Sequence, residues 1–177
     1  MLLSRHKSDP FLNRIVTCDE KWIQYDNRKR SAQWLDKDES PKHTPKRNIH
    51  EKKLMVSVWW SSAEKQPRLV NRSTPILLHD NARPRTAQMT VAKLQELELE
   101  LLHHSPYSPD LAPTDYYFFR NLDNFLIGKQ FNSDNAVKLA FQEFIDSRPP
   151  GFYTTGLNNL PLKWQKCIDN MGAYFDE

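Results

Sequence analysis

The sequence predicts an α/β domain, with strands concentrated in its first half and helices in its second. Residues 11–25 and 54–60 are rich in β-branched and aromatic side chains, which is typical of strands. A short apolar run at 75–79 has the length of a buried strand. Beyond residue 114 apolar residues recur at helical spacing. At 177 residues the chain is long enough for one domain with a hydrophobic core.

The predicted strands place acidic residues at or near their ends. The stretch 11–25 carries Asp19, and the strand 75–79 is followed directly by Asp80. Residues 98–103 alternate between polar and apolar and predict a further strand.

Helices are predicted from the spacing of apolar residues and from their stop signals. The first is expected to follow Thr86 as its N-cap, with an apolar face made by Ala87, Val91, Leu94 and Leu97. A proline-rich loop at 105–113 precedes a helix that begins near Thr114 and stops at Gly128. Two further helices are expected over 133–147 and 155–170.

Two polar stretches interrupt the strands. Residues 27–53 form a long loop with a cluster of positive charge, and residues 61–74 form a connector. A clustered positive strip attracts polyanions such as nucleic acid, although charge alone favours a solvated loop.

Composition excludes several classes of protein. The net charge is +3, and no run of apolar residues is long enough to span a membrane. The first ten residues lack the apolar region of a secretory signal. Cys18 and Cys167 lie far apart without a CxxC pair, which favours the cytosol or nucleus and argues against a disulfide framework or a structural zinc site.

Asp19, Asp80 and Asp115 are the candidate metal ligands. Carboxylates at the ends of strands converge at one edge of an α/β sheet, and hard cations such as Mg²⁺ prefer oxygen ligands. Each acid also has a purely structural interpretation. Asp19 fits an exposed charge, Asp80 fits a turn, and Asp115 fits a helix N-terminus. For each acid taken singly, the structural interpretation is favoured, and nothing in composition or periodicity overturns it.

Three segments resemble those of the mariner transposases of the Tc1/mariner group. They are VTCDEKW at 16–22, HDNARP at 79–84 and YSPDLAPTDYYFF at 107–119. Between Asp80 and Asp115 lie 34 residues, the interval that is typical of the mariner subgroup. The similarity extends over nearly the whole chain. A fusion of a SET methyltransferase to a mariner domain is known, and the chain resembles only its transposase half.

The resemblance implies an RNase H-like mixed sheet flanked by helices and a catalytic triad of Asp19, Asp80 and Asp115. It implies two bound Mg²⁺ ions, with Mn²⁺ as a substitute, that cut transposon ends and join them to TA targets in the nucleus. The stretch 27–53 corresponds to a clamp loop that contacts DNA and a second subunit, and Asp110 is expected to fix its own loop. The residues expected to contact DNA are Arg28, Lys29, Arg30, Lys42, Lys46, Arg47, Lys52, Lys53, Arg83 and Arg85.

Three departures from the family pattern are visible, of which the one at Arg85 is expected to be minor. The family's helix-turn-helix modules are expected to be absent, because the chain begins just before the catalytic domain, and this would weaken a homodimer. Arg85 stands where the family has histidine. The connector 61–74 is shorter than the family's by roughly thirty residues, the size of one edge strand and one helix. We expect their loss to expose apolar surface and to lower stability. The alternative function is a decayed or co-opted relic that binds DNA without catalysis.

Overall fold

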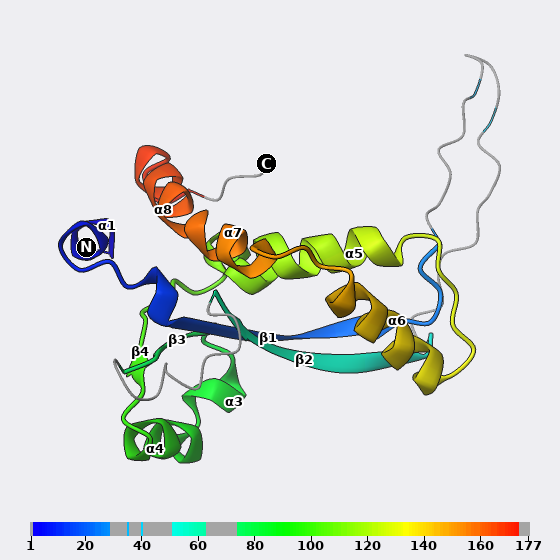
Figure 1. The fold of residues 1–177 in the computed structure, drawn as a ribbon, viewed down its shortest axis with the longest axis horizontal. Helices are drawn as coiled ribbons and strands as arrows, with labels where there is room; N and C mark the ends of the chain where they lie inside the picture. The colour runs from blue at the N-terminus through cyan, green and yellow to red at the C-terminus, as the bar shows by residue number, and fades with distance from the viewer. Residues whose placement is uncertain (1, 29–34, 36–39, 41–50, 63–73, 174–177) are drawn as a thin grey trace.

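A mixed four-stranded sheet forms the centre of the part of the chain that the structure describes (Figure 1). In this computed structural model the strand order is β2-β1-β3-β4. β1 runs antiparallel to β2 and parallel to β3, and β3 runs parallel to β4. The predicted α/β fold with a mixed sheet is confirmed. The strands are β1 Ile15–Gln24, β2 Lys53–Ser61, β3 Ile76–Leu78 and β4 Glu100–Leu101.

The description covers residues 2–28, 35, 40, 51–62 and 74–173. Most of the basic stretch 27–53 and of the connector 61–74 therefore lies outside the described residues. Within the described residues, no helix is both long enough and apolar enough to cross a membrane.

The two faces of the β1–β2 hairpin differ in how they are covered. Val58 and Trp60 on β2 are buried, whereas Trp59 between them is 62% exposed. Met55 and its cross-strand partner Trp22 are each 48% exposed. Side chains alternate between the faces of a strand, so these exposed residues share one face of the sheet. Whether this exposure comes from the shortened connector 61–74 lies outside the described residues.

Helices cover the other face. In Figure 1, α5, α7 and α8 lie on one side of the strands, and α3 and α4 lie on the opposite side. Ser133 caps the N-terminus of α6 by accepting a hydrogen bond of 3.3 Å from the backbone N–H of Ala136. The helix bounds on this face are α5 Arg120–Leu126, α6 Asp134–Asp146, α7 Phe152–Asn158 and α8 Leu160–Asp169.

The helix expected over 155–170 is two helices. α7 ends at Asn158, and α8 begins at Leu160 with Pro161 in its first turn, where the missing N–H of proline costs nothing. Leu157, Leu160 and Trp164 on these helices are buried. Ile168, although it follows the same apolar spacing, is 57% exposed because α8 turns that side to solvent.

The core is dominated by aromatic rings around Phe118. This residue is 1% exposed and lies in η3 (Thr114–Phe119), a π-helix that leads into α5. Its ring centroid lies 6.1 Å from that of Trp60 and 5.5 Å from that of Phe144. Stacked and edge-on aromatic contacts of this kind fix the position of η3 on the sheet.

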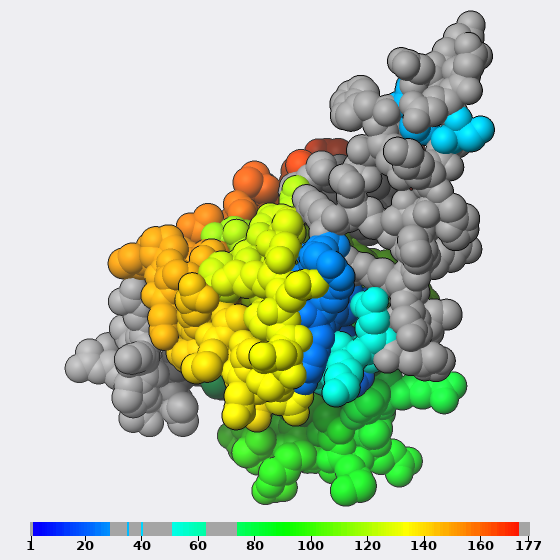
Figure 2. Space-filling view, turned by 90° about the vertical axis from the view of Figure 1, so that its right-hand side faces the viewer, coloured from blue at the N-terminus to red at the C-terminus, as the bar shows by residue number. Residues whose placement is uncertain are grey.

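The segment between β3 and β4 differs from the prediction. It forms two helices, and Thr86 ends α3 (Arg83–Thr86) instead of capping α4 (Gln88–Glu96), whose N-cap is the extended Ala87. No residue of α4 is buried, and Leu97 beyond it is 54% exposed. Figure 2 shows this segment, in green, projecting below the blue and cyan strands. The expected apolar face of this helix is therefore not packed against the core.

The helix α1 (Leu2–Ser8) was not predicted from the sequence. Leu2 and Leu3 pack against the core, and Arg5 forms an ion pair with Glu100 of β4. These tertiary contacts stabilise a helix that is too short to persist by propensity alone.

Candidate active site

The register of β1 and β3 brings the first two acids together. Thr17 on β1 lies opposite Leu78, the last residue of β3. Asp19 and Asp80 each lie two residues further along these parallel strands. Neighbouring strands are about 4.8 Å apart, so the two acids lie at the same level of the sheet. β1 continues to Gln24, so its edge beside Asp19 extends past the end of β3.

The third acid is positioned by the residue before it. Thr114 is 1% exposed, and its hydroxyl lies 3.0 Å from that of Thr17. The indole N–H of Trp60 donates a second hydrogen bond of 3.2 Å to the Thr114 hydroxyl. These contacts hold the start of η3 over β1, so that Asp115 reaches Asp19. π-helical turns are frequent at functional sites, because they redirect a side chain within a continuous helix.

The carboxyl group of Asp115 is strongly perturbed. Burial, and after it the nearby negative charge of Asp19, raise its pKa to about 7. The positive charge of Lys21 acts in the opposite direction, and the negative charge of Asp80 contributes to the rise. A carboxyl group is held neutral in this way when it faces other carboxylates without enough positive charge.

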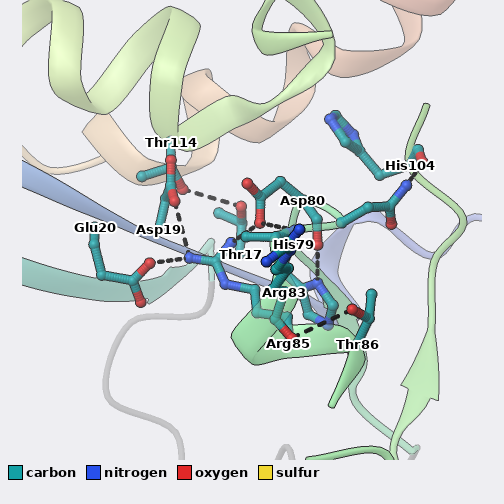
Figure 3. Close-up of polar contacts among 12 residues, drawn as sticks. Thr17, Asp19, Glu20, His79, Asp80, Arg83, Arg85, Thr86, His104 and Thr114 are labelled. Atoms are coloured by element: carbon teal, nitrogen blue, oxygen red, sulfur yellow. Dashed lines mark hydrogen bonds and ion pairs between the residues drawn. The ribbon is translucent and has the colours of Figure 1, made fainter. Parts of the chain in front are cut away.

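Arg85 supplies positive charge to the other two acids (Figure 3). One guanidinium nitrogen donates to Asp80 Oδ1 at 2.6 Å, and another donates to Asp19 Oδ1 at 2.9 Å. The second nitrogen also pairs with Glu20. The Arg85 side chain is only 10% exposed, so these ion pairs are partly shielded from solvent.

The three acids form the donor set that a hard divalent cation prefers, because all of them offer carboxylate oxygens. As placed, however, no three acidic, histidine or cysteine side chains among the described residues are arranged to hold a metal ion. One oxygen of Asp19 and one of Asp80, the Oδ1 atom of each, are paired with Arg85. The chemistry of the site therefore fits a cation, while Arg85 lies in its place.

Residues 24–64 match the family model described as "Transposase (partial DDE domain)". The chain is 52% identical to human histone-lysine N-methyltransferase SETMAR over 99% of its own length and 30% of that protein. It is 35% identical to the mariner Mos1 transposase of Drosophila mauritiana over 99% of its length and 60% of that protein. The crystal structure of the catalytic domain of Mos1 mariner transposase superposes with a TM-score of 0.79 at 31% identity, covering 90% of that chain. This chain belongs to the mariner transposases.

Within the mariner family, the chain corresponds to the catalytic domain, whose fold is RNase H-like. The mariner Mos1 paired end complex with Mg matches with a TM-score of 0.85 at 35% identity, and the chain covers 60% of it. The chain thus spans less than two thirds of the curated mariner relatives that it matches. Its alignment with the human relative extends over 206 residues, 29 more than the 177 of this chain. That the shortening falls in residues 61–74 stays a prediction.

Of the ten basic residues expected to contact DNA, five lie within the described residues, and one of these, Arg85, pairs with Asp19 and Asp80. Arg28 pairs with Asp26 at 2.6 Å, and Lys53 lies with its Nζ 4.5 Å from the ring centroid of Trp22. Lys52 and Arg83 are exposed. Lys29, Arg30, Lys42, Lys46 and Arg47 lie outside the described residues.

Sequence reasoning did not identify the residues that position the acids. Thr17 and Thr114 precede Asp19 and Asp115 by two residues and one residue, but a threonine in a strand or at a helix start is unremarkable on its own. The substitution at Arg85 was visible in the HDNARP segment, yet its partners depend on the strand register. Asp110, expected to fix its loop, is buried, and its Oδ1 has no hydrogen-bond partner within the described protein atoms.

Proposed function

We propose that this chain carries the metal-dependent DNA-cutting and DNA-joining centre of a mariner-type transposase. One observation carries the proposal. Three carboxylates from β1, the end of β3 and the start of η3 meet at the edge of the sheet, although 34 residues or more separate each from the next. The reaction is hydrolysis of a phosphodiester at a transposon end, followed by attack of the freed 3′-hydroxyl on a TA target.

Asp19, Asp80 and Asp115 are the proposed cation ligands. Two divalent cations, Mg²⁺ or Mn²⁺, would activate the attacking oxygen and stabilise the leaving oxygen of the phosphodiester. Asp19 pairs with Arg85, which also pairs with Asp80, and it lies close to Asp115. Asp19 is therefore the candidate ligand that both cations would share. Asp115 gives up its proton when it becomes a ligand, because carboxylates bind metal in the charged form.

DNA is the proposed partner, bound through its phosphates. Arg28, Lys52 and Lys53 lie at the two ends of the basic stretch 27–53, and Arg83 lies three residues after Asp80. Positive side chains at these positions neutralise phosphate charge and release counterions. Homodimerisation and a nuclear location belong to the same proposal. The relatives' structures with transposon ends support the DNA partner, and retention of all three acids favours an enzyme over a DNA-binding relic.

The test is nicking of a supercoiled plasmid in the presence of Mn²⁺ or Mg²⁺. The wild type is expected to convert the plasmid to open circles, and chelation of the cation with EDTA is expected to stop this. Asp80→Ala is expected to lower the rate at least about a hundredfold, the scale on which removal of one electrostatic catalytic group acts. Asp169→Asn, an exposed acid on α8, is the control and should leave the rate unchanged.

Two outcomes would contradict the proposal. Nicking by Asp80→Ala at the wild-type rate would exclude the site. Plasmid binding in a gel-shift assay with no cation-dependent nicking would favour the DNA-binding relic.

A further inference from the structure

The guanidinium of Arg85 fills the space between two of the proposed ligands. Its two terminal nitrogens lie 2.6 Å from Asp80 Oδ1 and 2.9 Å from Asp19 Oδ1. The Asp19 side chain is 21% exposed and that of Asp80 is 47% exposed, whereas Arg85 is 10% exposed. Of these three side chains, the positively charged Arg85 is therefore the least exposed to solvent.

The local fold holds Arg85 in this position. Asp80 Oδ1 accepts a hydrogen bond of 3.2 Å from the backbone N–H of Ala82, and the backbone N–H of Arg85 donates to the carbonyl of Ala82 at 2.9 Å. The turn that carries Arg85 is thus tied to the loop that carries Asp80. Because β3 ends at Leu78, the edge of β1 at Asp19 is open to a side chain from this turn.

A divalent cation and this guanidinium both bind the carboxylates of Asp19 and Asp80. A cation shared by Asp19 and Asp80 needs at least one oxygen from each, and the Oδ1 atoms of both are already paired with Arg85. A guanidinium and a divalent cation a few ångströms apart would also repel each other strongly in a partly buried site. Both cannot occupy this position at once.

We propose that Arg85 is a built-in counter-cation for Asp19 and Asp80, and that it competes with a divalent cation for them. Cation binding at this pair then requires the Arg85 side chain to leave. This inference rests on the proposed function, because it concerns the same three acids. It makes Arg85 a positioning residue that sets the cation concentration at which the site fills.

The test measures Mn²⁺ binding directly, without DNA, from the signal of free Mn²⁺ in electron paramagnetic resonance. Arg85→Gln keeps much of the side-chain length and removes the charge, and it is expected to bind Mn²⁺ at least about tenfold more tightly than wild type. A tenfold change in affinity corresponds to about 1.4 kcal/mol, the free energy that the ion pairs of Arg85 with Asp19 and Asp80 would withhold from the cation. Arg85→Lys keeps a charge but loses the two-pronged contact, and it is expected to bind with intermediate affinity. Lys93→Gln, which removes an exposed charge from α4, should leave the affinity at the wild-type value.

A second measurement guards against misfolding. Without Arg85 the acids repel one another, so Arg85→Gln should unfold at a lower temperature than wild type in EDTA. Mn²⁺ should then raise its thermal midpoint more than it raises that of the wild type. The extra affinity should disappear in the double variant that also carries Asp80→Asn.

Several results would overturn the inference. These are equal Mn²⁺ affinity in wild type and Arg85→Gln, equal tightening in Lys93→Gln, and tightening that survives Asp80→Asn. The outcome is separable from the proposed function. If the protein nicks DNA in a cation-dependent way but Arg85→Gln binds Mn²⁺ with wild-type affinity, only the proposed role of Arg85 is refuted. If Arg85→Gln binds Mn²⁺ more tightly in a way that depends on Asp80, but the protein does not nick DNA, only the proposed function is refuted.

Discussion

Thr17 on β1 and Thr114 at the start of η3 share a hydrogen bond of 3.0 Å between their hydroxyl oxygens. They are 97 residues apart in the sequence and are 2% and 1% exposed. Each lies within two residues of a proposed cation ligand. A buried polar contact therefore sets the distance between Asp19 on the sheet and Asp115 on the helix.

Thr114→Val is expected to destabilise the domain by about 1–3 kcal/mol. Valine keeps the shape but leaves the Thr17 hydroxyl and the Trp60 indole N–H buried without their partner. Chemical denaturation measures the change. Thr155→Val, an exposed threonine on α7, is the control and should cost less than about 1 kcal/mol. A loss at Thr114 no larger than at Thr155 would refute the anchoring role.

Gly156 is expected to tolerate no side chain. A Cβ at this position would lie 2.6 Å from Tyr117 Cδ1 and 2.9 Å from Trp60 Cη2. Gly156→Ala should cost about 1–3 kcal/mol, although alanine favours a helix, because two packed rings must move. Thermal unfolding checks this, with Thr155→Ala on the same helix as control. An unchanged or higher midpoint for Gly156→Ala would contradict the packing described.

The metal-free protein is expected to lose stability as the pH rises through the titration of Asp115. Folding raises the pKa of this carboxyl to about 7 from an ordinary value of 3.8. Between these values the folded state binds more protons than the unfolded state, so the free energy of unfolding falls with rising pH. Above pH 7 no further loss comes from this group.

Asp115→Asn removes that loss. In EDTA at pH 8 the variant should be more stable than wild type, by an amount on the order of 1–3 kcal/mol after allowance for solvent screening. At pH 4 the difference should largely vanish. Urea denaturation at the two pH values measures it, with Asp169→Asn as control. Wild-type and Asp115→Asn curves that run parallel from pH 4 to 8 would show that the carboxyl is not perturbed.

Trp59 and Trp60 are neighbours with opposite surroundings. Trp60 is 7% exposed and contacts Phe118, whereas Trp59, on the opposite face of the strand, is 62% exposed. Trp60→Ser should cost about 3–5 kcal/mol, and Trp59→Ser about 1 kcal/mol or less. Trp59→Ser should also reduce self-association in sedimentation experiments, because it shrinks an exposed apolar patch. Equal losses of stability would mean that the two faces are covered alike.

The positions of the strands and of the acids were predictable because they depend on local patterns. The β-branched stretch around Asp19 and the short apolar run before Asp80 predict strands from local sequence alone. The long α6 was equally predictable, since Val137, Ala140 and Phe144 recur at helical spacing and are buried.

What could not be predicted depends on register and packing. The pairing of Arg85 with Asp19 joins residues 66 positions apart and needs the end of β3 at Leu78. The π-helical form of η3, which packs Phe118 against Trp60, is not distinguished from an α-helix by the spacing of apolar residues. The prediction that Thr86 is an N-cap was wrong. Threonine is a common N-cap residue, but here the short helix α3 begins at Arg83 and ends at Thr86.

Anomalous diffraction from crystals soaked in saturating Mn²⁺ tests the central claim most directly. The account predicts anomalous peaks at direct coordination distance, about 2–2.5 Å, from carboxylate oxygens of Asp19, Asp80 and Asp115. It also predicts that the Arg85 guanidinium has moved away from Asp19 and Asp80. Well-occupied peaks elsewhere, with the three carboxylates bare and Arg85 still between two of them, would contradict it.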